Sequence, residues 1–190
     1  MCLYVGDIGD NKYQRDHISI YRIAEPLVLE FNTSTTTGNW QVGHYRYPND
    51  QKFNAESMMI DESTGEIVIV TKSKIPPYAF VFKAALNVKQ DLTLLEDTGI
   101  RLNLPDATDA TSSADGQVVI VRLYMGAFLW PKRSRHSTRS IVDILREEEC
   151  LVSVGMQRQG ESVALDPSGS SYFTHSEFVN QTIWQFNIYQ

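Results

Sequence analysis

The pattern that decides the fold of this chain is clearest at Glu56-Ser-Met-Met-Ile-Asp-Glu-Ser-Thr-Gly-Glu-Ile-Val-Ile-Val-Thr-Lys72. Two runs with the alternation and β-branched content of strands flank a tight turn at 63–65. The same strand, turn and strand return at 109–122 and again at 161–175. The turn glycines of the three copies lie 51 and 53 residues apart, at Gly65, Gly116 and Gly169. A hairpin that recurs at nearly equal spacing is typical of a repeat protein.

Further strands accompany each hairpin. A third strand, rich in aromatic and β-branched side chains, is predicted at 79–83, 127–130 and 183–188. A fourth, less regular strand is predicted at 92–96 and 150–154. The opening segment fits the same frame from its second strand onward, with strands at 3–5, 17–23 and 40–47. We expect this segment to lack the first strand of its unit.

A four-stranded antiparallel unit that repeats about every 50 residues is typical of a propeller blade. The sequence therefore predicts an all-β fold, a partial β-propeller of about three to four antiparallel four-stranded blades. We expect a single, incomplete propeller domain over 1–190, with blades at 1–53, 54–104, 105–157 and 158–190. A β-sandwich of short strands is the alternative fold, and the equal spacing of the hairpins favours the propeller.

One segment departs from the strand pattern, and it reads Ser140-Ile-Val-Asp-Ile-Leu-Arg-Glu-Glu-Glu149. Three apolar residues share one face of a helix drawn through it, namely Ile141, Ile144 and Leu145. Ser140 or Thr138 is placed to cap the start of that helix. We predict a short helix near 140–149, inserted between the third and fourth strands of its blade.

Composition excludes several classes of protein. The 17 Lys and Arg residues are outnumbered by 23 Asp and Glu, which gives a net charge of −6, and the only basic cluster lies at 132–139. These charges argue against a nucleic-acid partner. No apolar run approaches the roughly 20 residues of a membrane span, and the first residues do not read as a signal peptide. Cys2 and Cys150 cannot form a disulfide framework and lack the clustering of a zinc site.

Carboxylates recur at the heads of the three predicted first strands, 53 and 52 residues apart, at Glu56, Asp109 and Glu161. The first strand of each blade lines the central channel of a propeller, so we expect these side chains to converge near one axis. Converging carboxylates require a cation, a basic partner or raised pKa values. Lys72 and Arg122 follow the second strands of their blades, and Glu177 lies near the corresponding place in the last blade.

This acid-lined axial pocket predicts binding of a small polar ligand or a divalent cation. Oxygen ligands without His or Cys nearby suit Ca²⁺ or Mg²⁺. A metal-assisted hydrolase, phosphoesterase-like or lactonase-like, is one alternative, in which a bound metal activates water and Glu161 acts as general base. The other alternative is a protein-interaction scaffold, in which the acids pair with Lys72, Arg122 or backbone amides and hold the blades together.

The string Asp7-Ile-Gly-Asp-Asn11 supplies secondary candidates for the same pocket. Asp7, Asp10 and Asn11 offer oxygen ligands, but the string lacks the spacing of an EF-hand and its distant glutamate. The structural interpretation is that these residues cap a tight turn at a strand end, with Arg15 as a pairing partner.

Several short strings, in the same order along the chain, resemble those of a family of uncharacterised, mostly bacterial and often exported propeller-like proteins. The strings are Asp7-Ile-Gly-Asp-Asn11 with Arg15, Glu25-Pro26, Tyr47-Pro48, Asn54-Ala-Glu56, Thr71-Lys72, Asp115-Gly116 with Arg122 and Tyr124, Gly160-Glu161 and Ser176-Glu177. That family is similar to the esterase-like phytase propellers at the level of fold only. The resemblance therefore implies a propeller and no established activity.

The resemblance carries two further expectations. Family members usually have additional blades before the first string, which implies that this chain is N-terminally truncated and belongs outside the cytoplasm. A truncated propeller exposes an unpaired blade edge, so we expect self-association through that edge. The chain departs from the family pattern where an Arg-Thr-Tyr string reads Arg122-Leu123-Tyr124.

Overall fold

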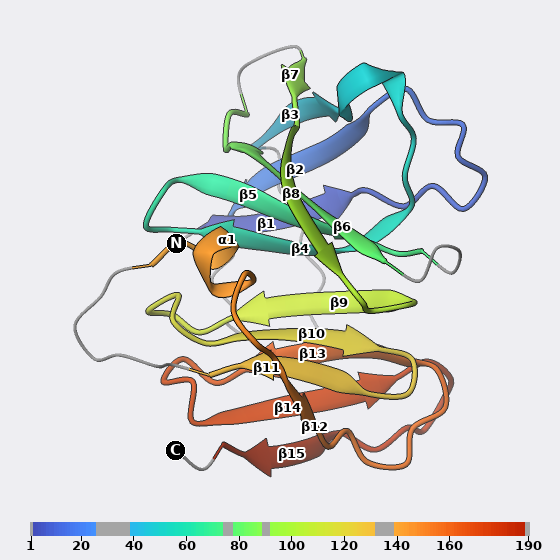
Figure 1. The fold of residues 1–190 in the computed structure, drawn as a ribbon, viewed down its shortest axis with the longest axis vertical. Helices are drawn as coiled ribbons and strands as arrows, with labels where there is room; N and C mark the ends of the chain where they lie inside the picture. Colours follow the sequence, from blue (N-terminus) through green and yellow to red (C-terminus); the bar gives the residue numbers. More distant parts are fainter. Residues whose placement is uncertain (1, 26–38, 74–77, 89–91, 132–138, 189–190) are drawn as a thin grey trace.

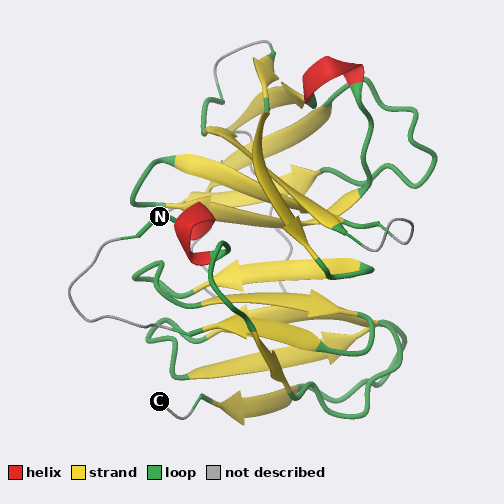
Figure 2. Ribbon diagram, in the orientation of Figure 1, coloured by secondary structure: helices red, strands yellow, loops and turns green. Residues whose placement is uncertain are grey.

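The computed structural model describes residues 2–25, 39–73, 78–88, 92–131 and 139–188. Nearly all of the regular structure is β, and it forms four sheets that follow one another in chain order (Figure 2). Small, mainly antiparallel sheets repeated in this way are the blades of a β-propeller. The predicted all-β fold, a β-propeller of three to four antiparallel blades, is therefore confirmed with four blades, and the expectation that the propeller is partial stays a prediction. Within the described residues, no helix has the length and apolar character needed to cross a membrane.

The first two sheets are formed mainly by residues 2–102. The first sheet contains β1 (Cys2–Asp7), β2 (Ile18–Ala24), β3 (Trp40–Arg46) and the two-residue β7 (Thr93–Leu94), which pairs in parallel with β3. A short 3-10 helix at Pro48–Asp50 leads out of this sheet. The second sheet contains β4 (Ala55–Asp61), β5 (Glu66–Thr71), β6 (Ala79–Ala85) and β8 (Glu96–Leu102).

The last two sheets repeat the order of the second. The third sheet contains β9 (Ala107–Ser112), β10 (Val119–Leu123), β11 (Ala127–Trp130) and β12 (Cys150–Val152). The fourth sheet contains β13 (Gly160–Leu165), β14 (Ser171–Ser176) and β15 (Trp184–Asn187). In both sheets neighbouring strands are consecutive in the chain and antiparallel, as expected for blades.

The first strands of successive blades are neighbours, since β4 packs against β9 and β9 packs against β13 (Figure 1). The core lies between the sheets rather than within them. Val68 and Val70 of β5 share one apolar cluster with Val119 and Val121 of β10. A strand covered on both faces needs a continuous apolar run, and the run at 67–70 supplies it.

The starts of the first strands and the ends of the second strands lie at one end of the sheets, which we call the entry end. The strands β4, β9 and β13 begin there, and their antiparallel partners β5, β10 and β14 finish there. The turn between β1 and β2 lies at the same end, because the Asp10 amide donates to Asn54 Oδ1 at 2.6 Å and Asn54 directly precedes β4. β1 therefore runs toward the entry end, as β5 and β10 do.

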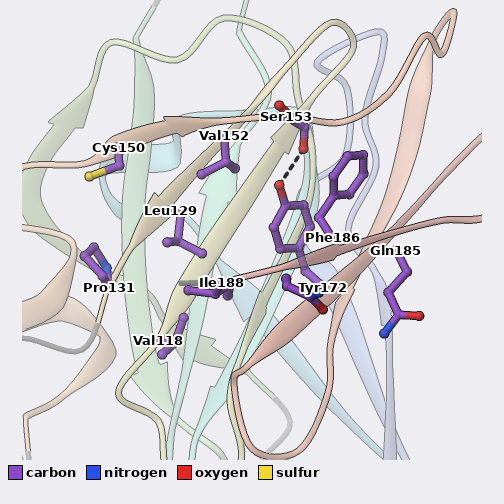
Figure 3. Close-up of a pocket in the computed structure, with 11 residues that line it drawn as sticks. Val118, Leu129, Pro131, Cys150, Val152, Ser153, Tyr172, Gln185, Phe186 and Ile188 are labelled. Carbon is purple, nitrogen blue, oxygen red and sulfur yellow. Dashed lines mark hydrogen bonds between the residues drawn. The ribbon is translucent and has the colours of Figure 1, made fainter. Parts of the chain in front are cut away.

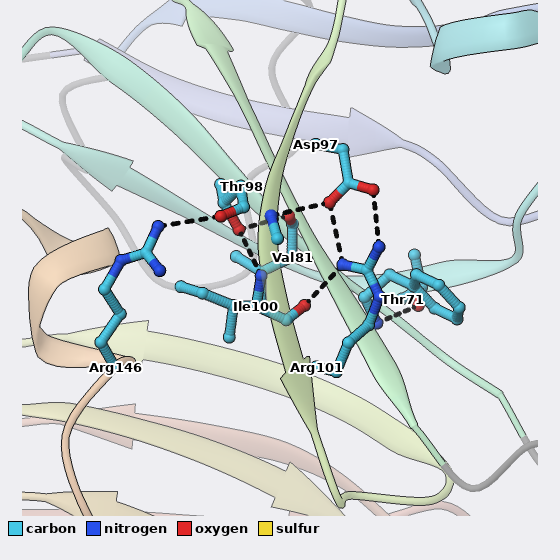
Figure 4. A network of polar contacts seen from close by, with 9 residues as sticks. Thr71, Val81, Asp97, Thr98, Ile100, Arg101 and Arg146 are labelled. Carbon is cyan, nitrogen blue, oxygen red and sulfur yellow. Dashed lines mark hydrogen bonds and ion pairs between the residues drawn. The ribbon is translucent and has the colours of Figure 1, made fainter.

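The predicted helix is present and short, as α1 (Ile141–Ile144) between β11 and β12. Ser140 caps it as predicted, in a reciprocal capping box with Asp143. Asp61, at the end of β4, accepts a buried hydrogen bond of 2.7 Å from the Ile141 amide. Figure 4 shows the second attachment, in which Arg146 donates to the Thr98 carbonyl of β8 at 2.8 Å. The insertion of the third blade is thus fastened to the second.

The fourth strand predicted at 92–96 is misplaced. Residues Thr93–Leu94 join the first sheet as β7, and the fourth strand of the second blade is β8, at Glu96–Leu102. The alternating burial of Ile100 and Leu102 explains why this later segment forms the strand. The fourth strand predicted at 150–154 is confirmed as β12. Most of the basic stretch at 132–139 lies outside the described residues, and the division into blades by residue number stays a prediction.

Candidate functional site

The strands β4, β9 and β13 each carry a β-bulge near their start, at the entry end. The pairing skips Glu56 between Ala55 and Ser57 of β4, and it skips Glu161 between Gly160 and Ser162 of β13. In β9 the pairing skips Thr108, between Ala107 and Asp109. A bulge leaves one residue unpaired and redirects its side chain. The equivalent positions of the three blades are therefore Glu56, Thr108 and Glu161.

Asp109 is one residue out of register with the two glutamates, which corrects the prediction that all three acids hold equivalent positions. A shift of one residue turns a strand side chain to the opposite face. Its carboxylate accepts hydrogen bonds of 2.8 Å from the amides of Ala110 and Val163. Burial raises the pKa of Asp109 to about 6, although these two amides favour the charged form. Asp109 therefore links β9 to β13 through the Val163 amide. The protein-interaction scaffold alternative predicted a contact of this kind, between an acid and a backbone amide of another blade.

Lys72 is the centre of the polar contacts at the entry end. Its ammonium donates to Glu56 Oε2 at 2.6 Å and to the Tyr124 hydroxyl at 2.7 Å, and it lies 4.3 Å from the centroid of the Tyr124 ring. Burial disfavours the charged amine, but these hydrogen bonds outweigh it and raise the pKa of Lys72 above its usual value. With its side chain only 9% exposed, Lys72 is fixed between the second and third blades.

Glu161 differs from Glu56 in having no hydrogen bond or ion pair of its carboxylate among the contacts of the described residues. Burial raises the pKa of Glu161, and the charges of Glu56 and Glu177 raise it further, while those of Lys72 and Arg122 oppose the rise. We call Glu56, Lys72, Tyr124, Glu161 and Glu177 the axial cluster. It brings together four of the predicted site residues and Tyr124.

Arg122 is fully buried and does not occupy the position equivalent to Lys72. Arg122 is paired with Asp109 in the third sheet. The residue of this blade that is equivalent to Lys72 and Glu177 is Tyr124, two residues further along the chain. The Arg122 guanidinium donates to the Gly126 carbonyl at 3.1 Å and to Gln157 Oε1 at 3.0 Å, while its Nε has no hydrogen-bond partner among the described residues. Burial lowers the pKa of Arg122, and the Glu161 carboxylate opposes that change.

Gly160 makes room for this arginine. A Cβ atom at Gly160 would lie 1.6 Å from Arg122 Nη2, so every residue other than glycine would overlap the guanidinium. Gly160 directly precedes Glu161, and its amide donates to the Tyr124 carbonyl at 3.0 Å. The packing of Arg122 against Gly160 thus sets the position at which the Glu161 side chain leaves the fourth sheet.

The turn at 7–15 is internally satisfied, as its structural interpretation predicted. Arg15 forms a bidentate pair with Asp7 at 2.6 and 2.8 Å, and its amide donates to Asp10 at 2.8 Å. Asn11 Oδ1 accepts from Asn54 Nδ2 at 2.9 Å, which fastens the turn to the start of β4. These contacts fix Asp7, Asp10 and Asn11 in the turn. A role for them in binding a ligand stays a prediction.

An apolar recess lies between the third and fourth sheets, and its lining includes no residue of the axial cluster. It has a volume of about 730 Å³, and its walls are mainly apolar side chains of β11, β12, β14 and β15 (Figure 3). The Tyr172 hydroxyl donates to the Ser153 carbonyl at 2.6 Å along one wall, and the Tyr172 ring stacks on Phe186 at 5.1 Å. The sequence did not predict this recess, because its lining comes from strands of two different sheets.

The acids of the axial cluster do not meet in the pattern of a metal site. No group of three or more His, Cys, Asp or Glu side chains able to hold a metal ion occurs within the ranges that the structure describes. At Glu56 the Lys72 ammonium already neutralises the carboxylate. The residues present therefore fit a Ca²⁺ or Mg²⁺ ion poorly.

Comparison with known proteins gives likeness at the level of fold. No protein-family model matches the chain, and no curated protein matches it. A chain of the "Nidogen/Laminin Complex" is similar with a TM-score of 0.57 and 10% identity, over 98% of this chain and 58% of that one. A "putative 6-phosphogluconolactonase from Bacteroides uniformis" is similar with a TM-score of 0.52 and 11% identity, over 93% of this chain and 49% of that one.

These two similarities support the fold and nothing finer. The chain spans about half of the length of the solved structures that it matches. The resemblance to the propeller-like family that carries the Asp7-Ile-Gly-Asp-Asn11 string, and its likeness to phytase propellers, stay predictions.

Proposed function

We propose that the protein binds a small polar ligand with a cationic, hydrogen-bond-donating group at the axial cluster. The observation that supports this proposal is the contrast between two equivalent glutamates. Glu56 is neutralised by Lys72 at 2.6 Å, whereas the contacts of the described residues include none that satisfies the Glu161 carboxylate.

The charges of the cluster define the class of ligand. Glu56, Glu161 and Glu177 contribute −3 and Lys72 contributes +1, so the cluster carries a net charge of −2, which the neighbouring buried Arg122 reduces to −1. An ammonium or guanidinium group on the ligand would lower the repulsion among the acids and satisfy Glu161. The Tyr124 hydroxyl accepts a hydrogen bond from Lys72, and we expect it to contact the uncharged part of the ligand.

A divalent cation has less support at this site than an organic cation. Such an ion needs several oxygen ligands at once, and it would have to displace the Lys72 ammonium from Glu56. The metal-assisted hydrolase depends on that ion, so it has less support for the same reason. No catalytic residue is proposed.

The proposal is tested by thermal unfolding in the presence of putrescine, with 1,4-butanediol as an uncharged compound of the same length. At ten times Kd, a ligand that binds only the folded chain stabilises it by about 1.4 kcal/mol. This corresponds to a rise in Tm of roughly 3–6 °C for a chain of this size. We expect a saturable rise with putrescine and none with the diol.

Variants localise the effect. Glu161→Gln should remove the response to putrescine, whereas Glu62→Gln, at the opposite end of β4, should keep it. CaCl₂ and a chelator serve as the cation test, and neither should change Tm. A response that persists in Glu161→Gln, or one that CaCl₂ reproduces, would contradict the proposal.

A further inference from the structure

The second and fourth blades place side chains at the same two positions of the entry end. A bulge in the first strand frees Glu56 of β4 in the second blade and Glu161 of β13 in the fourth. The residue directly after the second strand is Lys72 in the second blade and Glu177 in the fourth. Each blade therefore has one pair of residues at these positions, Glu56 with Lys72 and Glu161 with Glu177.

The backbone fixes both pairs in the same way. In the second blade, the Lys72 amide donates to the Asn54 carbonyl at 2.8 Å. In the fourth blade, the Glu177 amide donates to the Gln159 carbonyl at 3.2 Å. Each acceptor lies two residues before the bulged glutamate of its own blade. The two side chains of each pair therefore leave the backbone from equivalent places, and we expect them to approach each other equally closely.

The two pairs differ in their charges. In the second blade the charges are opposite, and Lys72 Nζ lies 2.6 Å from Glu56 Oε2. In the fourth blade both side chains are carboxylates, and no hydrogen bond or ion pair of either carboxylate occurs among the contacts of the described residues. Like charges at such positions repel each other. Burial raises the pKa of Glu161, and the charge of Glu177 is among those that raise it further.

Within its described residues, the fourth blade supplies no cation at the place where Lys72 lies in the second. The partner of Glu56 belongs to the same blade as Glu56, so the comparison is made within single blades. Arg158, two residues before β13, is exposed and is not among the charges that act on Glu161. A cation between Glu161 and Glu177 would have the role that Lys72 has beside Glu56, and it would relieve the repulsion of the two acids.

Lys72 also shows which kind of cation fits beside such a side chain. Its ammonium is a compact donor with three N–H groups, and it donates to Glu56 at 2.6 Å and to the Tyr124 hydroxyl at 2.7 Å. A guanidinium is planar and holds its donors in a rigid fork, and a quaternary ammonium has no N–H to donate. The Lys72 ammonium is carried on an unbranched alkyl stem, as in a primary alkylamine.

We propose that the ligand of the axial cluster is a primary alkylamine whose ammonium donates to both Glu161 and Glu177. The ammonium then has the place in the fourth blade that the Lys72 ammonium has in the second. This inference rests on the proposed binding of a cationic ligand at the axial cluster, and it adds the chemical class of the cation. It also gives Glu177 the role of a residue that determines specificity.

The position of Glu177 is tested without any ligand. The Glu177→Lys variant places an ammonium beside Glu161, as in the second blade, and should raise Tm by about 2 °C relative to Glu177→Gln. In the Glu161→Gln background the same comparison should give no rise, because the anionic partner is absent. Glu177→Lys should also lose the response to amines. A rise of equal size in both backgrounds, no rise in either, or a persisting response to amines would overturn the proposal.

The class of the cation is tested with three probes that share a butyl group, namely n-butylamine, n-butylguanidine and butyltrimethylammonium. We expect a saturable rise in Tm with n-butylamine, a weaker response to n-butylguanidine and none to the quaternary ion. Glu177→Gln should weaken the binding of n-butylamine about fivefold. Glu62→Gln, just after β4 at its opposite end, is the matched control and should leave that binding unchanged.

The outcomes separate this inference from the proposed function. Equal binding of all three cations, or equal binding of n-butylamine by the native chain and by Glu177→Gln, would overturn this inference and leave the proposed function standing. A failure of every probe to bind, putrescine included, would overturn both.

Discussion

Replacement of Gly160 by alanine should destabilise the protein far more than a single added methyl group normally does. The new Cβ atom would lie 1.6 Å from Nη2 and 2.2 Å from Cζ of Arg122, so the guanidinium has to leave its present position. Arg122 is fully buried, and its hydrogen bonds to the Gly126 carbonyl and to Gln157 would be lost or weakened.

The magnitude follows from these two bonds. A hydrogen bond from a charged donor is worth about 1.5–3 kcal/mol, and the displaced guanidinium recovers part of that by finding new partners. We therefore expect a loss of about 3 kcal/mol in the free energy of unfolding, with a fall in Tm of roughly 6–12 °C. Urea denaturation followed by tryptophan fluorescence measures the first quantity, and calorimetry measures the second.

A double-mutant cycle assigns the effect to Arg122. In an Arg122→Met background, Gly160→Ala should cost less than about 1 kcal/mol, because the overlapping atoms are gone. Gly126→Ala is the matched control. Its Cβ would lie 3.7 Å from Leu151, an ordinary contact, so stability should change by less than about 0.5 kcal/mol. The reasoning is refuted if Gly160→Ala costs the same in both backgrounds.

Three further predictions concern buried or paired carboxylates. The pKa of Asp109 is raised in the folded state to about 6, so its contribution to the free energy of unfolding is greatest below about pH 4 and is lost as the pH rises toward 6. Free energies of unfolding measured as a function of pH should show this loss, and the Asp109→Asn variant should show a smaller dependence on pH over the same range. Glu56→Gln leaves Lys72 without its anionic partner and should lower the free energy of unfolding in urea by about 1–3 kcal/mol. Asp61→Ala removes the acceptor of the Ile141 amide and should cost about 1–2 kcal/mol, with hydrogen exchange at that amide accelerated first.

Strand identity could be predicted from the sequence because the hairpins carry strong local signals. The run at 66–72 and the turn glycine before it define β5 and its connection without reference to any other part of the chain. Ser140, one of the two residues predicted to cap α1, is the one that does so, through a capping box with Asp143 in the same segment. Both features depend on residues that are close in sequence.

The register of the bulges could not be predicted in the same way. The bulge in β9 falls at Thr108 and turns Asp109 toward the Val163 amide, and no local signal separates these neighbours. The end of the second strand is a better guide to equivalent positions than the start of the first strand, because Tyr124 follows β10 at the position where Lys72 follows β5. The apolar recess could not be predicted either, because its walls bring together residues from two sheets, between Val118 and Ile188, that are far apart in the sequence.

The position of the axial cluster explains why the two equivalent glutamates have different expected roles. Glu56 lies within a blade whose own second strand supplies Lys72. At the equivalent place in its own blade, Glu161 has Glu177, which is exposed and carries the same sign of charge. We therefore expect Glu56 to have a structural role, and we propose Glu161 as the acid that binds the ligand.

The most direct test of this account is the free energy of unfolding of Glu161→Gln at pH 7, measured in urea against the native chain. The pKa of Glu161 is raised by burial and by neighbouring acids, so its ionised form opposes folding. The account predicts that the neutral variant is as stable as the native chain or more stable, while its response to putrescine is lost. A variant that is less stable by more than about 1 kcal/mol would show that Glu161 holds the blades together, and would contradict the account.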